Sequence, residues 1–144
     1  MEQSRKNKIF VDTGAFIAFA VKTEPYHQIA VDRFQKCFNQ GIEMVTTDYI
    51  LDELITFLRC RKKIKIETIL SFLVNAYSSG INVFGISEAL FGDAIGLMTR
   101  YRDHYFSCTD CVSFSVMKEM KIKNVLTTDK HFTIVGFNNL LVAR

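Results

Sequence analysis

The chain has 144 residues, of which 49% are hydrophobic, and a formal net charge of +3 at pH 7. This length predicts a single domain over residues 1–144 with a proper core, and no apolar stretch approaches the ~20 residues that span a bilayer, which excludes a transmembrane protein. The N-terminal segment is charged and lacks the long apolar stretch of a signal peptide, so we expect a cytoplasmic protein, and a net charge this small argues only weakly for a polyanionic partner.

Short β-rich runs alternate along the chain with longer stretches of helical periodicity. In chain order, we predict a strand at 8–12, a short helix after Thr13, a helix at 26–40, a strand at 43–46, helices at 48–61 and 65–78, a strand at 81–84, helices at 87–102 and 110–121, and strands at 124–127 and 139–142. This alternation is typical of an α/β protein in which helices cover both faces of a parallel sheet. The sequence has no internal repeat, and none of its scattered glycines forms a phosphate-binding loop.

Four acidic residues stand at the ends of apolar runs or inside one. Asp12 ends KIFVD, Asp129 ends NVLTTD and Asp110 opens DCVSFSVM. Glu53 lies inside YILDELITFL, where a solvated acid is not the default expectation. Taken singly, each has a simpler interpretation: Asp12 and Asp110 as helix caps, Asp129 as a turn residue, and Glu53 as an exposed acid paired with a basic neighbour.

The predicted sheet brings these acids toward one place. In open α/β sheets, ligands bind outside the carboxyl ends of the strands, where the strand order reverses. Asp12 and Asp129 both follow strands, so they face one crevice if the first and fourth strands are neighbours. Asp110 would reach this crevice from the first turn of its helix, and Glu53 from one to two turns inside its own helix.

The chemistry of such a cluster requires cations. Crowded carboxylates repel one another and raise each other's pKa values unless a divalent ion neutralises them. Ligation by oxygen alone favours Mg²⁺ or Mn²⁺, with water or a substrate phosphate in the open positions. Such an ion lowers the pKa of a bound water and neutralises charge in a phosphodiester transition state. The residues alone therefore indicate phosphodiester hydrolysis.

Three segments resemble the PIN-domain family, and within it the VapC-like toxin ribonucleases of type II toxin–antitoxin pairs: FVDTGAFIAF, TTDYILDELITFL and FSCTDCVSFSVMKEMKIKNVLTTDKHFTIVGFNNL. The resemblance extends over practically the whole chain. It implies a PIN-like α/β/α sandwich around a parallel sheet of strand order 3-2-1-4-5, and Mg²⁺- or Mn²⁺-dependent cleavage of single-stranded RNA. Under this resemblance, the catalytic and metal-binding quartet is Asp12, Glu53, Asp110 and Asp129, of which the fourth acid varies most in the family.

The resemblance also assigns roles to neighbours of the quartet. Thr13 matches the small hydroxyl residue beside the first acid of the family's motif. Thr109 and Thr128 lie beside the third and fourth acids, as groups that would orient the ligands. Gly14 is a mild departure from the pattern, and we expect it to loosen the start of the helix that follows Asp12.

Contacts with the substrate have several candidates. Lys130 and His131, directly after the fourth acid, would contact a phosphate of the RNA, although a turn residue is the simpler interpretation of His131. A base could stack on an exposed aromatic ring beside the acids, for which Tyr26, Phe106 and Phe132 are the candidates.

A toxin of this kind implies protein partners. We expect a cognate antitoxin that covers the acidic pocket with a short helical tail bearing Arg or Lys. The apolar helices 48–61 and 65–78 would form its docking groove. We also expect a homodimer.

Other functions share parts of this residue pattern. A receiver-type phosphate switch also gathers acids at strand ends, but it needs an Asp after the third strand, and INVFG offers none. Cys108 and Cys111 form a CxxC pair, yet the Asp between them raises the thiol pKa and the sequence context of a redox motif is missing. A non-catalytic PIN-like module that binds RNA or protein is the alternative that the sequence leaves open.

Overall fold

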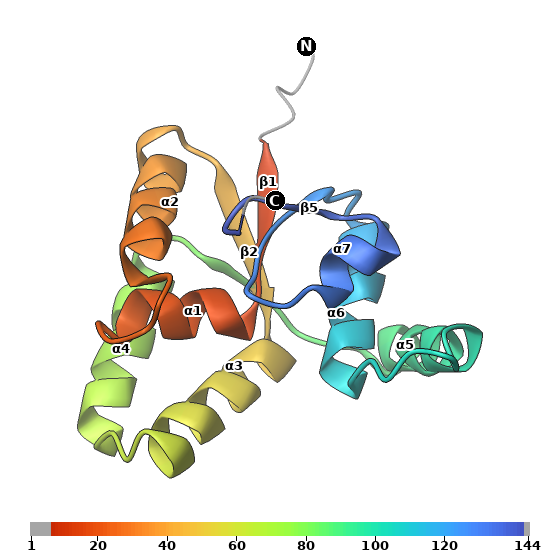
Figure 1. Ribbon diagram of the computed structural model, residues 1–144, viewed down its shortest axis with the longest axis horizontal. Helices are drawn as coiled ribbons and strands as arrows, with labels where there is room; N and C mark the ends of the chain where they lie inside the picture. Colours follow the sequence, from red (N-terminus) through yellow and green to blue (C-terminus); the bar gives the residue numbers. More distant parts are fainter. Residues whose placement is uncertain (1–6, 143–144) are drawn as a thin grey trace.

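The computed structural model describes residues 7–142 and has a parallel five-stranded sheet at its centre (Figure 1). The strands are β1 (Lys8–Val11), β2 (Glu43–Thr47), β3 (Asn82–Phe84), β4 (Asn124–Leu126) and β5 (Asn138–Asn139), in the spatial order β3-β2-β1-β4-β5. In this register, Phe10 of β1 lies between Val45 of β2 and Val125 of β4. The predicted fold and strand order are confirmed, and β1 and β4 are neighbours.

Helices cover both faces of the sheet. In Figure 1, α1 (Thr13–Ala20), α2 (His27–Asn39) and α4 (Ile66–Ser78) lie on one side, α6 (Cys108–Glu119) and α7 (His131–Val135) lie on the other, and α5 (Glu88–Arg100) packs outside α6. Beyond the carboxyl ends of the strands lies α3 (Asp48–Thr56), which continues as the π-helix η1 (Phe57–Arg61). Right-handed crossovers explain this division, because the chain crosses the sheet in one direction from β1 to β3 and in the opposite direction from β4 to β5. Within residues 7–142, no helix is both long and apolar enough to cross a membrane.

The C-terminal part differs from the predicted elements in two respects. The helix α7 was not predicted, because five residues are too few to show helical periodicity. It ends at Gly136, whose φ of 105° requires a residue without a side chain. The last strand, expected at 139–142, is limited to Asn138–Asn139. Beyond it, the side chain of Asn139 accepts a hydrogen bond from the Leu141 N–H at 2.9 Å, so the chain forms a turn there instead of continuing the strand.

Packing in the core fixes the positions of α6 and α7 relative to β1. Residues 111–117 of α6 are all buried, because this helix lies between the sheet and α5. The ring of Phe114 packs edge-on against that of Phe132 in α7 at 5.0 Å, and Phe132 stacks on Phe10 of β1 at 6.3 Å. These rings hold both helices against β1. Asp110 and His131, in the first turns of α6 and α7, are therefore held close together.

Candidate active site

Asp12 lies at the carboxyl end of β1, beside the end of β4. Its backbone N–H donates to the Leu126 carbonyl at 3.0 Å and thereby extends the pairing of the two strands. Its side chain is buried, and Oδ2 accepts a 2.6 Å hydrogen bond from the hydroxyl of Thr127. The same hydroxyl accepts a hydrogen bond from the Asp129 backbone N–H at 2.9 Å. Thr127 therefore connects the first acid to the segment that carries the fourth.

The electrostatic environment of Asp12 is unfavourable for a negative charge. Burial raises the pKa of its carboxyl to about 7, against the hydrogen bond from Thr127, and the negative charges of Asp110 and Glu53 raise it further. Asp12 occupies the N-cap position of α1, but its side chain makes no capping hydrogen bond. The simpler interpretation of this residue as a helix cap therefore does not account for its burial.

Asp110, Asp129 and His131 form a hydrogen-bonded cluster next to this strand end. The Nδ1 atom of His131 lies 3.0 Å from Asp110 Oδ2 and 3.2 Å from Asp129 Oδ2. A carboxylate oxygen can only accept, so Nδ1 is the donor in the hydrogen bond to Asp110, with Asp129 Oδ2 close by. The backbone N–H of His131 donates to Asp129 Oδ1 at 2.9 Å, which makes Asp129 a turn residue as well as a member of the cluster.

The position of Asp110 is set by the start of α6. Ser107 caps this helix: its hydroxyl accepts from the Asp110 N–H at 3.0 Å, while Asp110 Oδ2 accepts from the Ser107 N–H at 3.1 Å. Asp110 therefore caps α6, as its simpler interpretation predicts. It also contacts His131. The capping box orients its carboxylate toward the cluster.

Glu53 differs from the other three acids because its side chain is exposed. The buried residues of α3 are Ile50, Leu51 and Leu54. Glu53 lies outside this buried face, so the expectation that an acid in this apolar run is not solvated was wrong. Within the described part of the chain, Glu53 makes no side-chain hydrogen bond or ion pair. Its charge nevertheless raises the pKa of Asp12, which places it near the cluster but outside its hydrogen bonds.

The threonines predicted to support the acids have different environments. Thr13 is buried beside Asp12, and its hydroxyl has no hydrogen-bond partner. The carbonyl of Thr109 accepts a hydrogen bond from the Ser113 hydroxyl at 2.9 Å, within α6. Thr128 is exposed and lies against Gly14. The hydrogen bond to Asp12 comes instead from Thr127, for which the only signal in the sequence is its place at the end of the predicted strand 124–127.

Gly14 is required by close packing, a role that the sequence did not indicate. A Cβ at this position would overlap the Thr128 hydroxyl and lie 3.2 Å from Thr128 Cβ and 3.3 Å from its backbone nitrogen. Only glycine allows α1 and the segment after β4 to approach this closely.

Lys130 and His131 directly follow the fourth acid. Lys130 is exposed at the N-cap position of α7 and makes no ion pair among residues 7–142. His131 is half-buried within the cluster of acids, so the sequence underestimated its part in the site.

The chemistry of this donor set fits a hard divalent cation such as Mg²⁺ or Mn²⁺. One ligand atom from each of Asp110, Asp129 and His131 lies within 4.8 Å of the other two. A cation beside Asp12 would offset the burial that raises the pKa of its carboxyl. The buried Thr13 hydroxyl, which lacks a partner, is suited to hydrogen-bond a water carried by such an ion.

Comparisons with known proteins agree with this fold. The family model of the PIN domain matches residues 9–138. Curated protein sequences contain no match. Among solved structures, the chain is similar to VapC20 of Mycobacterium tuberculosis, described as a sarcin-ricin loop cleaving toxin, with a TM-score of 0.78 and 22% identity over 92% of this chain and 98% of that one. It is also similar to a DNA-bound VapBC from Salmonella typhimurium, with a TM-score of 0.63 and 17% identity over 92% and 96% of the two chains. Since the family model spans most of its length, the chain belongs to the PIN domain family.

Proposed function

We propose that this protein is a metal-dependent endoribonuclease that cleaves single-stranded RNA and acts as the toxin of a toxin–antitoxin pair. The observation that carries the proposal is the buried Asp12 at the end of β1, whose carboxyl has a pKa raised to about 7 beside two further acids. A buried carboxylate with such neighbours is costly unless a cation binds, and perturbed groups of this kind concentrate at catalytic sites. Membership of the PIN family and the fold shared with VapC proteins support the same function.

Each residue of the site has a role in this proposal. Asp12, Glu53, Asp110 and Asp129 hold Mg²⁺ or Mn²⁺ and so form the catalytic centre. A bound ion would supply charge neutralisation and a water of lowered pKa near the scissile phosphodiester. Thr13 and Thr127 orient the metal ligands and the waters bound to the ion. Thr109 and Thr128 directly precede Asp110 and Asp129 in the chain. Lys130 and His131 would contact the phosphate, His131 through an imidazole that lies beside Asp110 and Asp129.

Cleavage of a labelled pool of single-stranded RNA tests the proposal. The purified protein is compared in EDTA, Mg²⁺ and Mn²⁺, and Glu53→Gln is compared with Asp52→Asn, which removes one exposed charge from the adjacent position of the same helix. We expect cleavage only with metal, a loss of at least about tenfold for Glu53→Gln, and full activity for Asp52→Asn. A folded protein that cuts no RNA with either ion would instead favour the non-catalytic module.

Thr127→Val tests the link between the two strand ends. Valine keeps the shape of threonine but removes the hydrogen bond to Asp12 and leaves the Asp129 N–H without its acceptor. We expect a roughly 10- to 100-fold loss of kcat/KM and of metal affinity, because groups that orient metal ligands have effects of this size. Thr127→Ser keeps the hydroxyl and should retain most of the activity. Equal activity of both variants in the cleavage assay would show that this hydroxyl has no part in the reaction.

An antitoxin partner is supported by an apolar surface on the opposite side of the sheet from α6. A cavity of about 270 Å³ opens between α1, α2 and α4, lined mainly by five phenylalanines: Phe16, Phe19, Phe34, Phe38 and Phe72. On the face of α4 that points away from this cavity, Leu70, Val74 and Tyr77 are 52%, 62% and 55% exposed and form an apolar surface without a partner among residues 7–142. The docking groove was expected between helices 48–61 and 65–78, and the exposed residues Leu70, Val74 and Tyr77 lie on the second of these helices. We infer that the antitoxin covers this surface and that the protein dimerises through another one.

Val74→Asp tests this surface. A charge at the most exposed apolar position of α4 should weaken the complex with a co-expressed candidate antitoxin by about tenfold or more, as for other central interface residues. RNA cleavage by the free protein should be unchanged, because α4 lies on the opposite side of the sheet from α6 and α7, which carry Asp110 and His131 (Figure 1). Pull-down and cleavage assays measure both. An unchanged complex would place the antitoxin elsewhere.

A further inference from the structure

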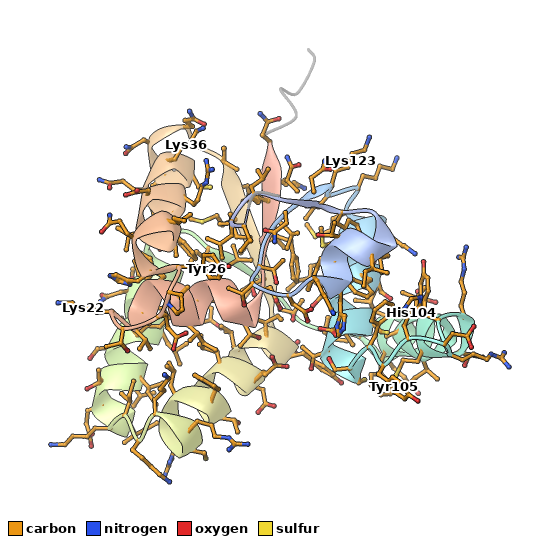
Figure 2. All side chains as sticks on the ribbon, in the orientation of Figure 1. Lys22, Tyr26, Lys36, His104, Tyr105 and Lys123 are labelled. Carbon is orange, nitrogen blue, oxygen red and sulfur yellow. The ribbon has the colours of Figure 1, made fainter. Side chains whose placement is uncertain are left out.

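The loop between α5 and α6, residues 101–107, carries the most exposed large aromatic side chain among residues 7–142. Tyr105 is 98% exposed, and the adjacent His104 is exposed as well. Figure 2 shows both side chains at this loop, beside α5 and α6. The aromatic residues that the sequence favoured for stacking do not have this exposure: Phe106 and Phe132 are buried, and Tyr26 lies at the start of α2 on the other side of the sheet.

This loop is continuous with the acidic site through stacked rings. The His104 ring lies parallel to that of Phe106, with an interplanar angle of 4° and a centroid separation of 5.0 Å. Phe106 in turn contacts the ring of His131, at 4.9 Å between centroids. The Nδ1 atom of His131 lies 3.0 Å from Asp110. A ligand on the His104 ring is thus separated from His131 by two ring contacts, through Phe106.

Basic side chains surround the same loop. The Arg100 guanidinium and the Lys118 Nζ lie 5.8 and 5.9 Å from the centre of the Tyr101 ring. Arg102 donates to the carbonyl of Thr99 at 3.2 Å. None of the three cations forms an ion pair with a carboxylate in residues 7–142. Together they provide positive charge for a phosphate backbone, against the single acid of the loop, Asp103.

The surroundings of Tyr105 favour a nucleic-acid base over a protein surface. The core of a protein interface consists of several adjacent apolar side chains that become buried together. Around Tyr105, the neighbouring residues Arg102, Asp103, His104 and Ser107 are polar and exposed. A base needs only one free ring face to stack on, with a cation nearby for its phosphate.

We propose that Tyr105 and His104 form a stacking platform for a base of single-stranded RNA that neighbours the scissile phosphodiester, with Arg100, Arg102 and Lys118 contacting its backbone. The platform rests on the proposed ribonuclease function and assigns the residues that bind its substrate. It is separate from the acids, so substitutions there should affect KM more than kcat.

The chain contains no tryptophan, which allows a direct test of stacking. Tyr105→Trp introduces one fluorescent ring at the platform, and Tyr26→Trp introduces one at the N-cap of α2, where no capping hydrogen bond is lost. Both are made in an Asp12→Asn background, so that the RNA is not cut. A single-stranded RNA oligonucleotide is titrated while tryptophan emission and the anisotropy of a label on the RNA are followed together. We expect quenching for Tyr105→Trp, with the same midpoint as the anisotropy, and none for Tyr26→Trp.

Kinetics of the otherwise unchanged protein provide the second test. Tyr105→Ala should raise KM for the RNA by roughly five- to 160-fold, which corresponds to the loss of one stacked base, while kcat changes little. Tyr105→Phe keeps the ring and should restore KM. Tyr26→Ala, the matched control, should leave both constants unchanged.

The results of these two tests distinguish a failure of the stacking platform from a failure of the proposed ribonuclease function. Binding by anisotropy without quenching at position 105, or an unchanged KM for Tyr105→Ala in a protein that cleaves RNA, would overturn the platform alone. Quenching by RNA in a chain whose unsubstituted form cleaves nothing would support the platform and contradict the ribonuclease. If RNA neither binds nor is cleaved, both proposals are wrong, and the loop has another role.

Discussion

Asp12→Asn is expected to abolish RNA cleavage and, at the same time, to stabilise the metal-free protein at pH 8. The loss of activity should be about 100-fold or more, since the substitution removes a carboxylate from the centre of the proposed metal site. The gain in stability has a different cause. Asparagine keeps the shape of the side chain and an oxygen that accepts from Thr127, but it carries no charge in a buried position.

The pH dependence of this gain follows from the raised pKa of Asp12. Its carboxyl has an ordinary value of 3.8 and a value of about 7 in the folded protein, so the folded state binds the proton more tightly than the unfolded state. The contribution of Asp12 to stability is therefore most favourable below pH 3.8 and is lost as the pH rises toward 7. The difference between Asp12→Asn and the unsubstituted protein should be small near pH 4 and constant above pH 7, at a few kcal/mol at most, because one pKa unit corresponds to about 1.4 kcal/mol.

Thermal unfolding in EDTA between pH 4 and pH 8 measures this difference. Asp52→Asn, an exposed residue of α3, is the control and should show no comparable trend. Added Mg²⁺ or Mn²⁺ should raise the melting temperature of the unsubstituted protein at pH 8 and have much less effect on Asp12→Asn. If Asp12→Asn is less stable at every pH, then the lost interactions of the carboxylate outweigh the cost of burying its charge.

Gly14→Ala is expected to disrupt the site through packing alone. The added methyl group would overlap the Thr128 hydroxyl and crowd its Cβ, so the segment after β4 must move. That segment carries Asp129 and His131, and a shift of a few tenths of an ångström would change the distances between them and Asp110. We expect at least a tenfold loss of cleavage, with a loss of stability of about 1–3 kcal/mol, as is typical of an overpacked site.

A second substitution and a matched glycine make this result specific. Thr128→Ala removes the hydroxyl that the new methyl group would meet, so the double variant should recover part of the lost activity. Gly92→Ala lies on the exposed face of α5 with no atom near its added methyl group, and it should leave cleavage unchanged and stabilise the helix slightly. Cleavage assays and melting curves of the four variants test this. Unchanged cleavage by Gly14→Ala would show that Thr128 can turn away without moving Asp129.

Local patterns in the sequence were sufficient for most of the fold. Alternating β-rich and helical segments indicated the α/β class and the bounds of most elements. A helix that is buried on one face, or a strand that is buried on both, leaves a pattern of apolar residues that can be read along the chain. The resemblance to PIN domains supplied the strand order, which places Asp12 and Asp129 at neighbouring strand ends. The short helix α7 left no such periodicity and was missed.

The details of the site depend on side-chain directions that the sequence does not contain. Thr127 and Thr128 are adjacent in the chain, yet one is buried against Asp12 and the other is exposed beside Gly14. Successive residues at a strand end point to opposite sides, so only the exact end of β4 decides which threonine supports the acid. The same holds for Glu53, which was expected to be sheltered and is exposed on α3.

The sequence by itself therefore determined the class of fold and the element pattern and indicated the four acids as candidates, since each depends on residues that are close together in the chain. Only the tertiary structure decided that Thr127 donates to an acid 115 residues away, that His131 lies between Asp110 and Asp129, and that Tyr105 is left in solvent. The physical reason is that each of these results from the packing of α6, α7 and the strand ends against one another. Such packing is a property of the assembled core and leaves no local periodicity to read.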